Sequence, residues 1–197
     1  MKICFATNND HKIKEVQALL GSTFQIVSLI DIGCNEELAE DQDTLEGNSL
    51  QKARYVYDHY RVPCFADDTG LEVQALNGAP GVYSARYAGH QRSAEDNMNL
   101  LLANLAAKEN RKAQFRTVVT LITGAGVNQF EGVLKGEILK EKRGTEGFGY
   151  DPLFLPDGHT KTLAEMSLAE KNTLSHRARA VHALTLFLKQ KNLATRV

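Results

Sequence analysis

Two adjacent carboxylates, Asp67 and Asp68, follow a short apolar run and are the side chains best suited to chemistry in this chain. Because strand side chains alternate between faces, one aspartate is expected to point into a site and the other to support a turn at 68–70. Together with a distant acidic segment, the pair favours a Mg²⁺ site, since Mg²⁺ prefers oxygen ligands. That segment contains no lysine or arginine and holds Glu36, Glu37, Glu40, Asp41, Asp43 and Glu46.

A second candidate is the junction between an expected strand and an expected helix, which reads Thr7, Asn8, Asn9, Asp10, His11 and Lys12. Backbone N–H groups at a helix N-terminus form an anion site. Lysines are electrostatically disfavoured there, at a cost of about 0.3–1 kcal/mol each, unless an anion binds. Lys12 and Lys14 therefore indicate a phosphate site. The alternative, equally supported, is that Asp10 caps the helix and both lysines are solvated.

A third candidate is the loop 144–152, where glycines flank Phe148. Glycine lets a backbone approach a ligand closely, and an aromatic ring offers a flat stacking face. The alternative is that Phe148 plugs the core.

A fourth candidate is the segment 170–177. Lys171 and Ser175 are expected one turn apart on one helical face, with His176 and Arg177 elsewhere around the helix axis. Its alternative is a basic surface helix.

Strand and helix patterns alternate along the chain, which predicts an α/β fold with a mixed, twisted β-sheet flanked by helices. We expect a single domain over residues 1–197, with two lobes around a central cleft. The expected strands are 2–7, 24–30, 63–67, 71–74, 115–123 and 132–139. The expected helices are 11–20 (ended by Gly21), 48–60, one capped by Ser93, and one long helix opened by the capping box at Ser167.

Composition excludes several classes of protein. The 197 residues are 43% hydrophobic and 24% charged, so the chain can bury a core and is not globally disordered. The net charge of −1 does not favour nucleic acid or an acidic membrane as a partner. No uncharged stretch is long and apolar enough to span a bilayer, and the three scattered cysteines predict neither a disulfide scaffold nor a zinc site. A cytoplasmic location is expected. The sequence has no P-loop, no complete dinucleotide fingerprint and no nucleophile elbow.

Taken together, these segments resemble the inosine triphosphate pyrophosphatase family, which hydrolyses XTP, dITP and ITP. The matching motifs, in the family's order, are 6–9 with Lys12, 66–71, 78–87, 147–152 and 170–177. The segment 40–49 follows the family pattern only loosely: it keeps Glu40, Thr44 and Asn48 but has Ser49 where the family has alanine. Which acidic residue of 36–46 completes the metal site is therefore left open.

The resemblance implies hydrolysis of a deaminated purine nucleoside triphosphate to monophosphate and pyrophosphate. It implies that Asp68 is the general base and that Glu40 and Asp68 hold Mg²⁺. It implies that phosphate oxygens are held by Lys171 and by the turn formed by Thr7, Asn8, Asn9, Asp10, His11 and Lys12. Thr69 would also bind the substrate. Phe148 would stack on the base. Backbone groups of Gly149, Tyr150 and Asp151, together with His176 and Arg177, would read its edge. Family members are commonly dimeric, so a homodimer is expected.

Three alternatives remain at this stage. The same pocket could serve a nucleotide-binding regulator without catalysis, although the aspartate pair favours catalysis. The enzyme could instead act on pyrimidine nucleotides. A nucleic-acid-binding module is disfavoured by the near-neutral charge.

Overall fold

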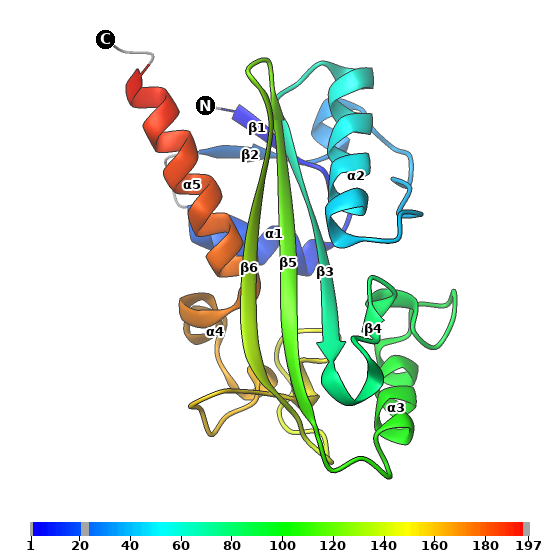
Figure 1. The fold of residues 1–197 in the computed structure, drawn as a ribbon. Helices are drawn as coiled ribbons and strands as arrows, with labels where there is room; N and C mark the ends of the chain where they lie inside the picture. The colour runs from blue at the N-terminus through cyan, green and yellow to red at the C-terminus, as the bar shows by residue number, and fades with distance from the viewer. Residues whose placement is uncertain (1, 21–23, 195–197) are drawn as a thin grey trace. The chain divides into compact units, whose positions relative to one another are not determined.

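The computed structural model describes residues 2–20 and 24–194, in which strands and α-helices alternate from β1 to β3 (Figure 1). The helices of these ranges are α1 (Asp10–Leu20), α2 (Leu45–Tyr60), α3 (Ala94–Asn104), α4 (Leu168–Leu174) and α5 (His176–Ala194). The strands are β1 (Lys2–Phe5), β2 (Gln25–Val27), β3 (Cys64–Val73), β4 (Pro80–Gly81), β5 (Lys112–Thr123), β6 (Gly126–Ile138) and β7 (Phe154–Pro156). Gly21, expected to end the first helix, lies outside the described residues. No helix of the described chain is long and apolar enough to cross a membrane.

The strands form one mixed sheet in the order β2-β1-β3-β5-β6-β7, with β4 paired to β3. β1 is parallel to both β2 and β3, whereas β4 is antiparallel to β3 and β7 is antiparallel to β6. β3, β5 and β6 are its long strands (Figure 1). The predicted α/β class, with a mixed sheet and flanking helices, is confirmed.

The chain divides into two compact units. The first contains residues 1–68, 117–132 and 177–197, and the second contains residues 69–116 and 133–176. β3, β5 and β6 contribute residues to both. The predictions of a single domain and of a central cleft stay predictions.

In the first unit, strand residues are buried on both faces with a period of two. Phe5 and Phe65 stack with ring centroids 4.6 Å apart in a core shared with α1 and α5. Cys64 and Ala66, on the opposite face of β3, belong to a core shared with α2. Continued along β3, this alternation places Asp67 on the side of α1 and α5, and Asp68 on the side of α2.

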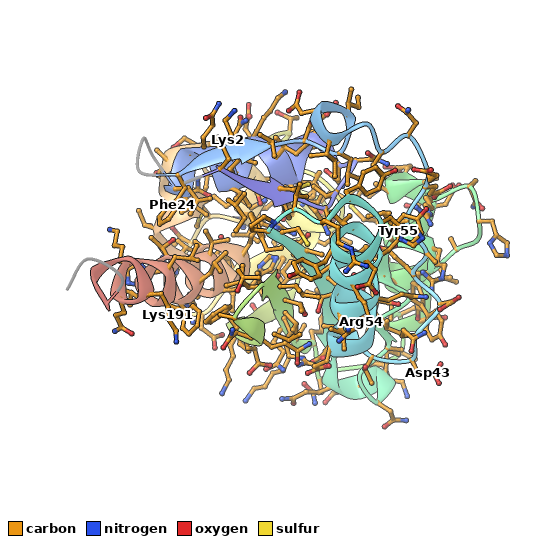
Figure 2. All side chains as sticks on the ribbon, turned by 90° about the horizontal axis from the view of Figure 1, so that it is seen from above. Lys2, Phe24, Asp43, Arg54, Tyr55 and Lys191 are labelled. Atoms are coloured by element: carbon orange, nitrogen blue, oxygen red, sulfur yellow. The ribbon has the colours of Figure 1, made fainter. Side chains whose placement is uncertain are left out.

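Helix α2 begins at Leu45, three residues before the expected start, because Thr44 caps it by accepting a hydrogen bond from the Gly47 N–H at 3.0 Å. Lys52 and Ala53 are buried, whereas Arg54, labelled on this helix in Figure 2, is exposed. A lysine on the inward face of a helix needs a charged or polar partner, because burying an unpaired charge is costly.

The second unit has its own apolar core, to which α3, β5, β6 and the chain after β6 contribute. Ser93 caps α3 as predicted, accepting a hydrogen bond from the Asp96 N–H at 3.2 Å. Leu101, Phe115 and Tyr150 all lie in this core. Tyr150 thereby fixes the predicted base-binding loop to the core.

The expected turn at 68–70 is wrong, because β3 continues without a break from Cys64 to Val73. Leu71 pairs with Gly81 of β4, and a Cβ at Gly70 would lie 2.6 Å from the Gly81 carbonyl oxygen. The glycine that indicated a turn is therefore required by the close approach of β4.

The expected single helix after Ser167 is also wrong. The Ser167–Glu170 capping box opens α4 as predicted, but Ser175 is extended (φ −63°, ψ 154°) and separates α4 from α5. Lys171 and Ser175 therefore do not share a helical face. The break also divides the segment between the units, leaving Lys171 in the second and Arg177 in the first.

Candidate active site

Asp67 and Asp68 have different partners, as their alternation along β3 requires. Asp67 is 1% exposed and accepts hydrogen bonds from Lys12 of α1, at 2.9 Å, and Arg177 of α5, at 3.0 Å. Asp68 is 8% exposed and accepts a hydrogen bond from Asn48 of α2 at 3.0 Å. Adjacent carboxylates in one strand are thus placed in two separate electrostatic environments.

Asp67 is the centre of a buried ion-pair network. Arg177, 1% exposed, donates from Nη1 to Glu15 at 2.5 Å and from Nε to Asp67. Burial alone would raise the pKa of Asp67, but the charges of Lys12 and Arg177 outweigh it and hold that pKa well below its usual range. Asp67 is therefore ionised throughout the working pH range and acts as the fixed counter-charge of two cations.

The Thr7–Lys12 junction is capped by Asn9, whose Oδ1 accepts a hydrogen bond from the Lys12 N–H at 3.1 Å. The alternative, in which Asp10 caps the helix and both lysines are solvated, is wrong in two respects. Asn9 is the capping residue, and the Lys12 ammonium is bound by Asp67. Burial lowers the pKa of Lys12, and Asp67 opposes that shift. Lys14 is exposed, as that alternative expected. The N-terminus of α1 therefore presents backbone donors beside a lysine anchored by a carboxylate.

Lys52, which the sequence analysis did not identify, connects the carboxylates of this unit. It is 5% exposed and donates to Glu40 and, at 2.7 Å, to the backbone carbonyl of Asp67. Burial lowers the pKa of Lys52, but the charges of Glu40 and Asp68 more than compensate and leave that pKa raised. Lys52 is thus a protonated cation beside both predicted metal ligands.

Asn48 is a second residue that was missed as a site residue. Its Nδ2 donates to Asp68, and its Oδ1 accepts from the backbone N–H of Gln42 at 2.9 Å. One buried amide therefore joins Asp68 to the acidic segment that carries Glu40. Ser49, where the family has alanine, shares a buried hydrogen bond of 2.6 Å with Thr120, which fixes α2 to β5.

The environment of Asp68 is that of a base rather than of a structural counter-ion. Burial raises its pKa first; the Lys52 and Lys12 charges oppose this, Glu40 adds to it, and the pKa remains raised. A carboxylate with a raised pKa takes up a proton more readily, which suits general-base catalysis. The pKa values of the two aspartates are thus shifted in opposite directions.

The Glu40–Asp68 pair fits Mg²⁺ chemically. Both groups offer hard carboxylate oxygens, and Glu40 is close enough for its charge to raise the pKa of Asp68. In the described residues, no group of three or more His, Cys, Asp or Glu side chains is arranged to hold a metal ion. Mg²⁺ is usually held by one or two protein carboxylates together with substrate phosphates, so two carboxylates are sufficient donors.

The second unit organises the aromatic loop around Asp151. Asp151 Oδ2 accepts hydrogen bonds from the Phe148 N–H at 2.9 Å and from Lys171 at 2.5 Å. The Lys171 ammonium also lies 4.9 Å from the centroid of the Phe148 ring. Phe148 is half-buried, so it does not simply plug the core. Glycines with positive φ, Gly147 (75°) and Gly149 (62°), flank the ring and allow this bend.

Lys171 and His176 are buried in this unit, so the reading of 170–177 as a basic surface helix is wrong for both. His176 stacks on Phe115 with ring centroids 4.6 Å apart. The contacts of Lys171 are with the loop predicted to bind the base, and its assignment to phosphate oxygens stays a prediction. Arg177 is committed to Asp67 and Glu15, and its predicted role in reading the base also stays a prediction.

The two units divide the predicted site residues between them. The first contains Thr7, Asn8, Asn9, Asp10, His11, Lys12, Glu40, Asp68 and Arg177. The second contains Thr69, Phe148, Gly149, Tyr150, Asp151, Lys171 and His176.

The missed residues had a weak signal in the sequence. Asn48 and Lys52 are four residues apart in a predicted helix, and Lys52 stands beside Ala53 on its apolar face. A polar pair on the buried side of a helix indicates partners inside the protein. Glu15 gave no such signal, because its partner Arg177 is 162 residues away in the sequence.

The fold is a mixed α/β sheet in which aspartates contact buried lysines beside a capped helix N-terminus. These features are typical of proteins that bind phosphorylated ligands. The chain belongs to the Ham1 family, whose family model matches residues 3–187. This match confirms the family resemblance indicated by the motifs.

Individual relatives match over nearly their whole length. A dITP/XTP pyrophosphatase of Flavobacterium psychrophilum is 52% identical over 189 residues, covering 96% of this chain and 100% of that protein. The solved structure of the Staphylococcus aureus Ham1 protein is similar with a TM-score of 0.89 at 35% identity, covering 97% of this chain and 100% of that one. A nucleoside-triphosphatase / dITP/XTP pyrophosphatase from Mycobacterium abscessus is similar with a TM-score of 0.76 at 43% identity, covering 93% and 98%.

Replacing each aspartate by asparagine should separate their roles. Asp67→Asn removes the counter-charge of Lys12 and Arg177 and should lower the free energy of unfolding by about 3–5 kcal/mol, as expected for a broken buried ion pair. Asp68→Asn relieves a buried charge and should leave that free energy unchanged or raise it. Urea unfolding at neutral pH measures both. Equal destabilisation by the two variants would contradict the assignment.

Asn48→Leu should move the acid limb of the kcat/KM profile to higher pH. The amide donor stabilises the ionised form of Asp68, so its loss raises the pKa of Asp68 further, and the base becomes protonated at a higher pH. The matched control is Asn97→Leu, since Asn97 is also buried and makes two hydrogen bonds, to the backbone of Ala85 and Ala88. If the acid limb lies at the same pH in the wild type and in Asn48→Leu, Asn48 does not set the pKa of Asp68.

Proposed function

We propose that this protein hydrolyses the deaminated purine nucleoside triphosphates dITP, ITP and XTP to the nucleoside monophosphate and pyrophosphate. The observation that carries the proposal is the pair of opposed carboxylates: Asp67 neutralised by two cations, and Asp68 beside it with a raised pKa. Relatives named dITP/XTP pyrophosphatase, 52% and 54% identical over almost the full chain, support the same reaction.

The reaction breaks the bond between the α-phosphorus and the oxygen that bridges to the β-phosphorus. Water adds to the α-phosphorus and pyrophosphate leaves. Asp68 accepts the proton of that water, a role that requires a carboxylate which is ionised but basic. Asn48 orients Asp68 for this step by holding its Oδ2.

Most of the predicted phosphate contacts come from residues of the first unit. The α1 N-terminus offers backbone N–H donors, and Lys12 and Lys52 supply positive charge nearby. Both ammonium groups are already held, Lys12 by Asp67 and Lys52 by Glu40 and the Asp67 carbonyl. Less side-chain entropy is therefore lost when a triphosphate binds, because the cations are preorganised.

Glu40 and Asp68 are the residues that would hold Mg²⁺. When bound there, Mg²⁺ would neutralise charge on the triphosphate and favour one orientation of it. Lys52 donates to Glu40 and is therefore the residue that keeps the Glu40 carboxylate in place.

The base is bound by the second unit, where one face of the Phe148 ring is covered by the Lys171 ammonium and the other is the stacking surface. Stacking contributes about 1–3 kcal/mol per base. A hydrogen-bond donor fixed opposite C6 of the base favours the oxo group of hypoxanthine and xanthine. The amino group of adenine would leave that donor unpaired, at a cost of about 1–3 kcal/mol.

The homodimer and the cytoplasmic location stay predictions.

A panel of dITP, ITP, XTP, dGTP, dATP and dUTP, each with and without Mg²⁺, tests the proposal. Release of pyrophosphate should be fastest with the first three and should require Mg²⁺. Asp68→Asn should lose turnover while still binding ITP, because it keeps the shape of the side chain and loses the base. Binding of ITP without hydrolysis by the wild type would instead identify a regulator, and preference for dUTP would identify a pyrimidine enzyme.

Phe148→Ala tests base stacking separately from phosphate binding. It should raise KM for ITP by about fivefold or more, the equivalent of 1 kcal/mol of lost stacking. The inhibition constant of pyrophosphate should not change, because that product has no base. Equal losses for ITP and pyrophosphate would argue against stacking.

A further inference from the structure

The motif at 78–87 has no role in the function proposed above, yet it is bonded directly to the predicted base-binding loop. Ser84 in this segment is 7% exposed. Its backbone carbonyl accepts a hydrogen bond of 2.8 Å from the Tyr150 hydroxyl. Tyr150 is 5% exposed and is separated from Phe148 by one residue.

Ser84 is itself held in place by its own side chain. Its hydroxyl accepts from the Leu71 N–H at 2.8 Å and donates to the Gly81 carbonyl at 2.6 Å. Leu71 and Gly81 are paired residues of β3 and β4. The carbonyl that receives the Tyr150 hydroxyl is therefore fixed to the sheet through two short hydrogen bonds.

The loop needs such an attachment, because glycines with positive φ flank Phe148 on both sides. Glycine has more accessible backbone conformations than any other residue, so the ring is not positioned by its immediate neighbours. Asp151 fixes the backbone N–H of Phe148. The Tyr150 hydroxyl provides a second attachment from within the core.

We propose that Tyr150 and Ser84 are positioning residues for the specificity of the reaction: they hold Phe148 at the height and angle at which it stacks on the base. Tyr150 is too deeply buried to stack on a substrate itself. The inference rests on the proposed function, because it assigns to Phe148 the recognition of the base.

Tyr150→Phe removes only the hydroxyl and leaves the ring in the core. The Ser84 carbonyl then loses its donor, and the loop that carries Phe148 loses an attachment. We therefore expect KM for ITP to rise about fivefold or more. We also expect kcat to stay within twofold, the preference for ITP over dGTP to narrow, and the inhibition constant of pyrophosphate to be unchanged. A merely destabilised enzyme would lose active molecules, and so kcat, without a change in KM or in base preference.

Tyr87→Phe is the matched control. Tyr87 lies in the same motif and unit and packs against the same core as Tyr150, but its hydroxyl accepts a hydrogen bond from Asn104 at 2.8 Å, outside the loop 147–151. This variant should keep the wild-type KM and base preference.

Ser84→Ala should reproduce the Tyr150→Phe effect. The double variant should raise KM little more than either single variant, because both changes act on one attachment. Additive effects would overturn the coupling.

The outcomes distinguish this inference from the function on which it rests. If Phe148→Ala loses ITP affinity and Tyr150→Phe does not, the positioning role is wrong and the proposed function stands. If the wild type hydrolyses none of the nucleotides, the proposed function fails. In that case the backbone ¹⁵N–¹H NMR signal of Phe148 still decides: a shift in Tyr150→Phe but not in Tyr87→Phe supports the attachment, and no shift in either refutes it.

Discussion

The need to neutralise Asp67 inside the protein is the constraint on which the rest of the first unit depends. A carboxylate that is 1% exposed is tolerated only if cations reach it, and Lys12 and Arg177 come from two helices far apart in the sequence. Their pairing sets where α1 and α5 lie against β3. The same pairing places the α1 N-terminus, with its backbone donors, beside the strand that carries Asp68. One set of contacts therefore meets a structural requirement and forms the proposed phosphate site.

Period-two alternation explains how neighbouring aspartates serve different purposes. Asp67 shares its face of β3 with Phe65 and the helices that bring its cations, whereas Asp68 shares its face with Ala66 and α2. The first is ionised by strong pairing, and the second keeps a raised pKa. Under the proposed function, two residues in one strand thus divide the stabilisation of the fold from the chemistry.

The sequence was sufficient for the α/β class, the caps at Ser93 and Ser167, and the family, because these depend on local patterns. It was not sufficient for the cap at Thr44, which starts α2 earlier than expected. It was not sufficient where a distant backbone decided the outcome. Gly70 indicates a turn locally, but the approach of Gly81 makes it part of a strand. Ser175 fits a helix locally, but it is extended between two helices. Glu15 and Lys52 could not be assigned, because their partners are known only once the chain is folded.

The unbroken course of β3 has a consequence for how the protein responds to heat or mild denaturant. Functional residues commonly sit on loops, which open early, but Asp67 and Asp68 lie inside β3, which runs without a break from Cys64 to Val73. The segment around Glu40 and the glycine-flanked loop around Phe148 lack such a ladder. Partial unfolding would therefore release the groups that we propose select and orient the substrate while the two aspartates are still held in β3. In an inactivation experiment, selectivity would disappear before the secondary structure does.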